Sequence, residues 1–221
     1  MKQLVKTGLA AVLTAALSST GMGEAAPKVQ FSGQHQTLDN ELRKRITGSS
    51  WHRGCPVPRR NLRLLKVLHW GFDNEVHHGR LIVHANEVRH MLKVMEDLFD
   101  QNFRIRRMRL VDAYGADDHR SMNADNTSAF NCREVAGSPG VWSEHAYGKA
   151  IDVNPIENPY VTISGHVSPP AGVLYADRTP HRRGMVNPGG KVVRIFAKRG
   201  WKWGDNWSGT KDYQHFSTSG H

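Results

Sequence analysis

Two short segments of this chain place the strongest constraint on its fold. The first reads Ser-Glu-His-Ala-Tyr-Gly-Lys-Ala-Ile-Asp over residues 143–152, and the second reads Asp-Tyr-Gln-His-Phe over residues 212–216. Two imidazoles and a carboxylate, with a second carboxylate three residues before the last imidazole, are the side chains of an open zinc site with a general base. The fold must therefore gather side chains from both segments around one point.

The spacing within the first segment excludes a single regular element. In one continuous helix, His145 and Asp152 would share a face but stand about 10 Å apart along the axis. Zinc ligands bind at about 2 Å, so neither this helix nor a straight strand brings both to one ion. We therefore expect a chain reversal at Gly148, because glycine adopts such backbone conformations most readily. A short strand over residues 149–153 should follow, with Ala150 and Asp152 on one face.

The second segment poses the opposite problem. Asp212 and His215 are three positions apart, so a regular strand would point them to opposite faces. We expect a turn at Tyr213 and Gln214 that leaves His215 at the start of a strand.

These motifs resemble a known family. The pattern Ser-x-His-x-x-Gly-x-Ala-x-Asp, followed by Asp-x-x-His-Phe, resembles the zinc D-alanyl-D-alanine carboxypeptidase and L-alanyl-D-glutamate endopeptidase family, which cuts peptidoglycan stem peptides. The likeness covers residues 51–216. It includes Asn-Thr-Ser-Ala-Phe-Asn-Cys-Arg at residues 126–133 and Gly-Trp-Lys-Trp-Gly at residues 200–204.

The resemblance implies both the fold and the chemistry. It implies an α+β fold of the hedgehog-like type, with a small, mainly antiparallel sheet and packed helices. It also implies that His145, Asp152 and His215 hold one zinc ion per chain, and that Asp212 activates the attacking water. Zinc held by three protein ligands keeps a fourth position open for water, as catalytic sites require.

Five further residues are candidates for substrate binding. The resemblance favours Arg109, although the basic composition around it favours a solvated strand face. Ser128 and Arg133 belong to the segment that lines the cleft in the family, and a structural ion pair is the alternative for Arg133. Ser143 would either bind substrate or brace the turn before His145. Trp203 would either floor the cleft or pack in the core.

The first residues of the chain have the pattern of a secretory signal peptide, over residues 1–25. Lys2 and Lys6 precede an apolar run at residues 8–17, and Gly-Glu-Ala at residues 23–25 suits cleavage. This run is too short to span a bilayer, so we expect a protein of the cell envelope or exterior without stable membrane insertion. A membrane-tethered N-terminus is the alternative.

Behind this leader, the length suits one domain. We expect a lead-in over residues 26–60 and a zinc peptidase domain over residues 61–221. Apolar patterning predicts strands at residues 62–72 and 79–84 and an amphipathic helix at residues 86–101. Further predicted elements are a short helix capped by Asp39, a strand at residues 103–111, a polar loop at 112–131, a helix at 191–199 and a strand at 201–203.

A long irregular stretch over residues 154–190 is rich in proline and glycine. Such a stretch inside a compact domain is usually functional, so we expect it to form one wall of the cleft. His166 and His181 within it are expected at the surface, not as further ligands.

The two cysteines, Cys55 and Cys132, both lie behind the leader. An oxidising compartment favours a disulfide between them, and two separate buried thiols are the alternative. The formal net charge is +10, which suits an anionic polymer such as cell wall. The chain has no block of basic residues interleaved with aromatic ones, so we do not expect nucleic acid as a partner. We expect a monomer.

Two classes of function compete. The first is a zinc peptidase of the cell wall, acting either as a carboxypeptidase on terminal D-alanine or as an endopeptidase within the stem peptide. The second is a non-catalytic wall-binding module of the same fold. Asp212 distinguishes them, because a binding module has no use for a base beside an open metal site.

Overall fold

The computed structural model describes residues 29–221, so the expected signal peptide at residues 1–25 lies outside the described part. Residues Phe31–His221 form one compact unit. From Phe31 onward, the expected lead-in of residues 26–60 therefore belongs to the same unit as the expected catalytic domain. No helix within the described residues is long and apolar enough to cross a membrane.

The first sheet contains three antiparallel strands in the order β1-β2-β3. Strands β2 and β3 form a hairpin in which Leu62 pairs with His84 and Trp70 pairs with Val76. The second strand therefore begins at Val76 and not at the expected Gly79, because the intervening residues also pair. The strands are β1 (Gly33–Thr37), β2 (Leu62–Trp70) and β3 (Val76–His84).

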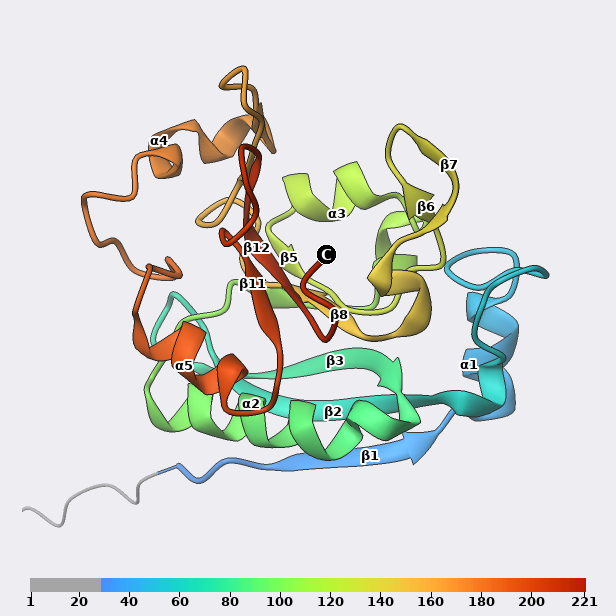
Figure 1. Ribbon diagram of the computed structural model, residues 1–221. Helices are drawn as coiled ribbons and strands as arrows, with labels where there is room; N and C mark the ends of the chain where they lie inside the picture. The colour runs from blue at the N-terminus through green and yellow to red at the C-terminus, as the bar shows by residue number, and fades with distance from the viewer. Residues whose placement is uncertain (1–28) are drawn as a thin grey trace, which may run out of the picture. The chain divides into compact units, whose positions relative to one another are not determined.

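The helix α2 (Val88–Asp100) packs against this sheet (Figure 1). It confirms the amphipathic helix predicted at residues 86–101, and a 3-10 turn, η2 (Ala85–Glu87), precedes it. Its apolar side chains recur at three- and four-residue spacing, so they lie on one face and enter the core. The buried residues of α2 are Val88, Met91, Val94, Met95, Leu98 and Phe99.

The second sheet is built around strand β12. Its strands run in the order β10-β9-β12-β11, and β8 also pairs with β12. All of these pairs are antiparallel, which confirms the α+β class with mainly antiparallel sheets. The strands are β8 (Ala150–Asp152), β9 (Tyr160–Val161), β10 (Val167–Ser168), β11 (Lys202–Gly204) and β12 (Lys211–Ser217).

Two predicted elements are wrong. The strand predicted at residues 103–111 is reduced to β4 (Arg107–Met108), which pairs in parallel with β5 (Asn126–Thr127), and to a single parallel bridge between Arg104 and Trp70. The loop predicted at residues 112–131 contains η3 (Val111–Tyr114) and α3 (Asp118–Asn123).

The remaining elements are short. Asp39 caps α1 as expected, because its Oδ1 accepts a hydrogen bond of 2.8 Å from the Leu42 amide. The irregular stretch of residues 154–190 contains only β9, β10, η5 and α4. The other elements are α1 (Asn40–Ile46), η1 (Arg59–Asn61), β6 (Glu134–Val135), β7 (Ser138–Trp142), η4 (Glu144–Tyr147), η5 (Pro170–Gly172), α4 (Val173–Ala176) and α5 (Lys191–Ala197).

One apolar core joins the two sheets with α2 and α5. The ring of Phe196 on α5 stacks on Phe216 of β12, with centroids 3.8 Å apart. Because Phe216 directly follows His215, this packing holds the end of β12 in place. The core residues from the two sheets are Leu65, Val67, Leu81, Val83, Ile151, Trp203 and Phe216.

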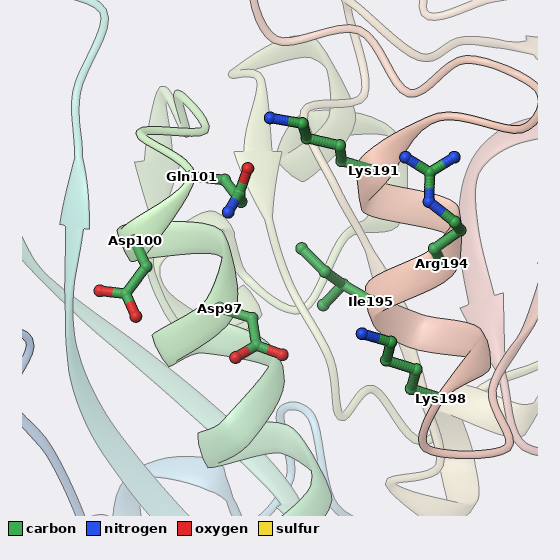
Figure 2. A pocket seen from close by; sticks show the side chains of 7 residues that line it. All are labelled: Asp97, Asp100, Gln101, Lys191, Arg194, Ile195 and Lys198. Carbon is green, nitrogen blue, oxygen red and sulfur yellow. The ribbon is translucent and has the colours of Figure 1, made fainter.

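A surface hollow of about 400 Å³ lies between α2 and α5 (Figure 2). Acidic side chains from α2 and basic side chains from α5 line it. An ion pair of 2.6 Å between Asp97 and Arg199 also links α2 to the residues after α5. Within the described chain, no group of possible metal ligands lies in this hollow, so we assign it no chemistry. Its charged residues are Asp97, Asp100, Lys191, Arg194 and Lys198.

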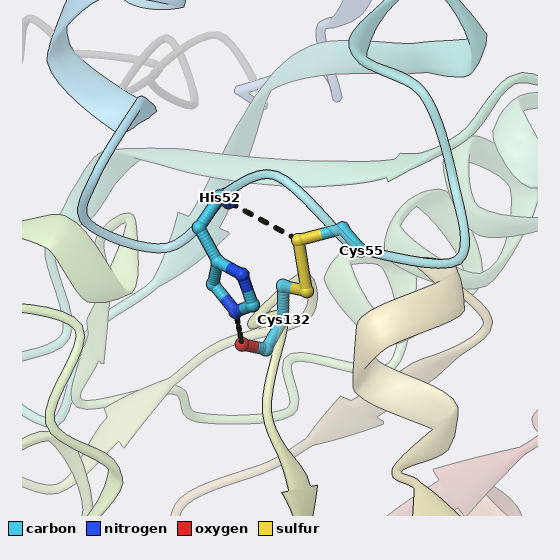
Figure 3. A group of neighbouring side chains, drawn as sticks. All are labelled: His52, Cys55 and Cys132. Atoms are coloured by element: carbon cyan, nitrogen blue, oxygen red, sulfur yellow. Dashed lines mark hydrogen bonds between the residues drawn. A yellow bond between two sulfur atoms is a disulfide. The ribbon is translucent and has the colours of Figure 1, made fainter.

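A disulfide between Cys55 and Cys132 confirms the expected pairing (Figure 3). It joins the segment after α1 to the segment after β5. The next residue back, Asn131, donates its amide to the His145 carbonyl (3.2 Å), so the disulfide lies close to the expected metal-binding turn.

Replacing both cysteines, as Cys55→Ser with Cys132→Ser, should lower the free energy of unfolding by about 4 kcal/mol. The physical reason is that the bond closes a loop with a sequence separation of 77 and so restricts the unfolded chain. Urea unfolding of the variant and of reduced wild type should give the same loss. Equal stability of oxidised and reduced protein would contradict a constraining role for this disulfide.

An ionic cluster of Arg106 with two buried carboxylates lies near the end of β8. Arg106 bonds Asp125 through Nε (2.7 Å) and Glu157 through Nη2 (2.8 Å). Asp125 and Glu157 are 0% and 1% exposed. Burial raises the pKa of Glu157 to about 7; the Asp125 carboxylate adds to this rise, and Arg106 opposes it.

This raised pKa predicts a pH-dependent stability. The folded pKa exceeds the unfolded value of 4.5, so the contribution of Glu157 to stability is complete below about pH 4.5 and is lost as the pH rises through about 7. Glu157→Gln should remove this part of the decline. Urea unfolding across this range checks it, with Glu41→Gln at an exposed site of α1 as the control. Parallel profiles for wild type and Glu157→Gln would show the expectation to be wrong.

Candidate functional site

The pairing of β8 with β12 brings two of the expected ligands together. Asp152 on β8 is the direct partner of His215 on β12. Side chains of directly opposed residues in an antiparallel pair lie on the same face, with Cβ atoms about 5 Å apart. The register alone therefore places this carboxylate beside this imidazole. The main chain of Ser128 supports the arrangement, since its amide and carbonyl bond those of Asp152 (3.1 and 2.9 Å).

His145 reaches the same point through the predicted reversal. It lies in the 3-10 turn η4, which Ser143 caps and which ends at Gly148 with φ +65°. The Gly148 carbonyl accepts a hydrogen bond of 2.9 Å from the His84 amide, so the reversal rests directly on β3. A Cβ at position 148 would lie 2.6 Å from that amide nitrogen. Only glycine therefore suits both the dihedral angles and the space.

Three side chains meet at the spacing of a metal site. His145 Nε2 lies 3.2 Å from His215 Nδ1 and 3.2 Å from Asp152 Oδ2, and His215 Nδ1 lies 3.1 Å from Asp152 Oδ1. Tetrahedral ligands about 2 Å from one zinc ion stand about 3.3 Å apart. His145, Asp152 and His215 are 2%, 4% and 5% exposed. This group could hold a metal ion, as the sequence predicted.

Each imidazole also bonds a main-chain oxygen through its other nitrogen. His145 Nδ1 lies 2.5 Å from the Ala129 oxygen, and His215 Nε2 lies 3.1 Å from the His221 oxygen. Because such oxygens only accept, these nitrogens carry the protons. With a metal ion bound, the lone pairs of His145 Nε2 and His215 Nδ1 would then be directed at the shared point, which is the orientation that metal-binding histidines need.

The surroundings of Asp152 and His215 favour the charged forms of both side chains. Burial by itself would raise the pKa of Asp152, but the two imidazoles outweigh it and hold that pKa well below its usual range. Burial likewise opposes a positive charge on His215, yet its hydrogen bond to Asp152 raises the pKa of His215. The carboxylate therefore stays ionised between the two rings.

Asp212 reaches the site by a bulge and not by the predicted turn. Strand β12 is continuous from Lys211 to Ser217, so the turn predicted at Tyr213 and Gln214 is wrong. Instead, the register against β11 shifts, and Asp212 pairs with Gly204 while Phe216 pairs with the preceding Trp203. The extra residues on β12 offset the alternation of side chains, so Asp212 and His215 both face the same cavity.

The environment of Asp212 suits proton exchange. Its Oδ1 is buried and has no hydrogen-bond partner within the described chain. Burial raises the pKa of Asp212 to about 6; the Asp152 carboxylate adds to the rise, and His215 opposes it. Asp212 is thus a carboxyl group with a free oxygen beside the three possible ligands.

A cavity of about 630 Å³ opens above these four residues. Its walls are largely apolar and aromatic, and Figure 1 shows hairpin β6–β7 and helix α4 on opposite sides of the C-terminal residues. The hairpin side of the cavity contributes Val135, Ala136, Val141 and Trp142. The opposite side contributes Tyr160, His166, Ser168 and Trp207.

Two of the expected substrate-binding residues line this cavity. Arg133 is the one arginine or lysine among the lining residues of the described chain, and its Nη2 lies 2.8 Å from Asp118 Oδ2. The ion pair agrees with the structural alternative for Arg133, and its role in substrate binding stays a prediction. Ser143 also lines the cavity, while its Oγ accepts a hydrogen bond of 3.3 Å from the His145 amide. The hydroxyl thus braces the turn, as the alternative predicted.

The other three expected residues do not line the cavity. The side chain of Arg109 is exposed, and its main chain is held by Asn126 (2.8 Å). Ser128 is buried and acts through its main chain on Asp152. Trp203 is 3% exposed and packs in the core on Phe216, as its alternative predicted.

The lining residues that were not predicted for the site include Tyr160, His166, Trp207 and His221. His166 is exposed, as expected, yet it also borders the cavity. Trp207 and His221 belong to no recognisable motif. The pairing of β9 with β12, which sequence patterning did not reveal, brings Tyr160 opposite Asp212.

A second group of possible ligands, His52, Cys55 and Cys132, can be set aside. Its two sulfur atoms are bonded to each other (Figure 3), so neither is a thiolate. Both ring nitrogens of His52 lie within hydrogen-bond distance of main-chain oxygens, those of Arg53 and Cys132.

The comparison with known families agrees with the site. Residues 136–218 match the family model described as D-alanyl-D-alanine carboxypeptidase. The resemblance is thereby confirmed over this segment. It contains all four residues of the site, whereas Arg109, Ser128 and Arg133 lie before it. No curated protein sequence and no solved structure matches the chain.

Gly148→Ala should weaken both the fold and metal binding. The new Cβ would strain the backbone and press on the His84 amide, so we expect a loss of about 2 kcal/mol in unfolding free energy and weaker zinc binding. Urea unfolding and chelator competition measure the two effects. Gly189→Ala is the matched control, because Gly189 has φ +63° but open space around its Cβ position. Equal behaviour of the two variants would refute the contact with β3.

Proposed function

We propose that this protein is a zinc metallopeptidase that hydrolyses peptide bonds in peptidoglycan stem peptides. It would act as a D-alanyl-D-alanine carboxypeptidase or as an L-alanyl-D-glutamate-type endopeptidase. The observation that carries the proposal is the convergence of His145 Nε2, Asp152 and His215 Nδ1 within 3.2 Å of one another, beside Asp212. The family match over residues 136–218 supports the same conclusion.

The residues present fit zinc. Two imidazole nitrogens and one carboxylate oxygen are ligands that zinc takes in catalytic sites, and both histidines have their second nitrogen occupied. Held by these three ligands, zinc would keep a further position for water or substrate, and the same three residues line the cavity. When bound there, zinc supplies Lewis acidity toward a carbonyl oxygen and an attacking water.

Asp212 would move the proton in this reaction. Its buried Oδ1 has no partner in the described chain, so it is free to accept a hydrogen bond from the attacking water. In the proposed reaction, this oxygen takes a proton as the water attacks the scissile carbonyl, and the carboxyl group passes it to the leaving amine as the C–N bond breaks. The proton gained in the first half is lost in the second, so Asp212 returns to its starting state.

The cavity would hold the peptide. Its apolar and aromatic walls suit the short side chains and backbone of a stem peptide, and Arg133 offers a guanidinium to a peptide carboxylate. Both substrate types carry such a carboxylate. The product of the reaction therefore distinguishes carboxypeptidase from endopeptidase action, and mass spectrometry identifies that product.

The place of action would be the cell envelope or exterior. The disulfide between Cys55 and Cys132 supports an oxidising compartment. The net charge of +10 supports association with an anionic wall polymer.

Two substitutions test the mechanism. Asp212→Asn should retain zinc but lower hydrolysis at least 100-fold, since an amide cannot take the proton. His215→Ala should lose both zinc and hydrolysis, because it removes a ligand. Metal analysis together with mass spectrometry of digested muropeptides measures both properties. Loss of one alanine would identify a carboxypeptidase, and scission of the stem an endopeptidase.

Asp205→Asn is the matched control for these variants. It changes a nearby aspartate that pairs with Lys211 (3.6 Å) and does not line the cavity, so it should retain both zinc and activity. Undiminished cleavage by Asp212→Asn would exclude Asp212 as the base. Zinc binding without cleavage of any muropeptide by wild type would favour the wall-binding module.

A further inference from the structure

The last residues of β12 and those after it fold back into a tight turn. Ser217 Oγ donates to the His221 oxygen (3.0 Å) and accepts from the Gly220 amide (3.0 Å). The His221 amide donates to Ser219 Oγ (3.2 Å). Gly220 has φ +91°, which allows the chain to reverse. These bonds bring the His221 main-chain oxygen back toward the strand that carries His215.

Two side chains from outside the turn hold it in place. The indole nitrogen of Trp207 donates to the Gly220 oxygen (2.6 Å), and Lys202 Nζ donates to the Ser219 oxygen (3.1 Å). The ring of Trp207 also lies against His215, with centroids 5.6 Å apart. The turn is therefore fixed from both β11 and the segment between β11 and β12.

The turn ends next to His215 Nε2, the ring nitrogen that does not face the other two possible metal ligands. The His221 oxygen lies 3.1 Å from His215 Nε2, and this oxygen can only accept. An N–H at Nε2 donates to this oxygen, and this arrangement leaves the lone pair of Nδ1 for a metal ion. That nitrogen is the one that lies 3.1 Å from Asp152 and 3.2 Å from His145. The opposite tautomer would direct an N–H bond at the shared point and prevent metal binding.

We propose that residues 219–221, fixed by Trp207, are a positioning element that sets the tautomer and ring orientation of His215 for metal binding. The family match ends at residue 218, so this element lies outside the matched segment. His145 has its own support in the Ala129 oxygen, which leaves the turn to act on His215 alone. The inference rests on the proposed function, because it assigns the element to a metal ligand.

Three variants separate the turn from the rest of the fold. A chain ended at Thr218 keeps the pairing of β12 with β8, since the Thr218 amide still donates to Lys149 (3.1 Å). Trp207→Phe keeps the whole chain and the ring beside His215 but removes the indole donor. Trp51→Phe is the matched control, because it removes an indole bond to another main-chain oxygen, at Val57 (2.8 Å).

Zinc affinity by chelator competition is the first measurement. We expect the shortened chain to bind zinc about 10- to 100-fold more weakly than wild type, as loss of a hydrogen bond behind a metal-binding histidine does. Trp207→Phe should show a smaller loss in the same direction, and Trp51→Phe should match wild type. Unchanged affinity in both the shortened chain and Trp207→Phe would overturn the inference while leaving the proposed function intact.

The second measurement is the ring orientation of His215 in metal-free protein, from NMR contacts between the ring protons of His215 and those of residue 207. Wild type should show one fixed ring position against Trp207, and the shortened chain should show averaging over several positions. This result does not require that the protein bind zinc, so it decides the inference even if wild type binds none and the proposed function fails. The same fixed ring position in wild type, the shortened chain and Trp207→Phe would also overturn it.

Discussion

The antiparallel pairing of β8 with β12 is the constraint on which the rest of the site depends. Because Asp152 and His215 are direct partners in this pair, their side chains lie on one face without any help from loops. Core packing makes the pair rigid: Phe216, the residue after His215, is fully buried and stacks on Phe196 of α5. A site built on paired strands keeps its geometry better than one built on loops. Only His145 arrives by a turn, and that turn is tied to β3.

Asp152 and His215 lie on paired strands, whereas the walls of the cavity are less regular. Each imidazole has its outward nitrogen next to a main-chain oxygen, of Ala129 for His145 and of His221 for His215. Ala129 precedes the site residues in the sequence, and His221 follows them. Asp212 stands apart from this set, because a bulge and not the regular strand alternation turns it toward the cavity. The outward nitrogen of each imidazole thereby has a hydrogen-bond partner, while Oδ1 of Asp212 has none within the described chain. By this difference, the two imidazoles would bind the metal ion and Asp212 would exchange a proton.

The spacing of residues in the sequence predicted much of the site. It predicted less of the structure around the site. The reversal at Gly148 followed from ligand distances that no helix or strand can meet, and the helix α2 followed from its apolar period. The turn predicted between Asp212 and His215 was wrong, because a register shift against β11 solves the same geometric problem within a continuous strand. The strand predicted at residues 103–111 was also wrong, since alternation in the sequence does not reveal whether a partner strand is present.

By itself, the sequence determined which side chains could form the site, because zinc ligands and their base need particular residue types at spacings that exclude regular elements. It also predicted the α+β class through the family resemblance, and it favoured a disulfide between the two cysteines over two separate thiols. Only the tertiary structure decided which of the candidate substrate residues face the cavity, placing Arg133 there and Arg109 outside. It alone brought Trp207 and His221 against His215. These contacts depend on strand register and on chain reversals between residues distant in sequence, and no local pattern encodes either.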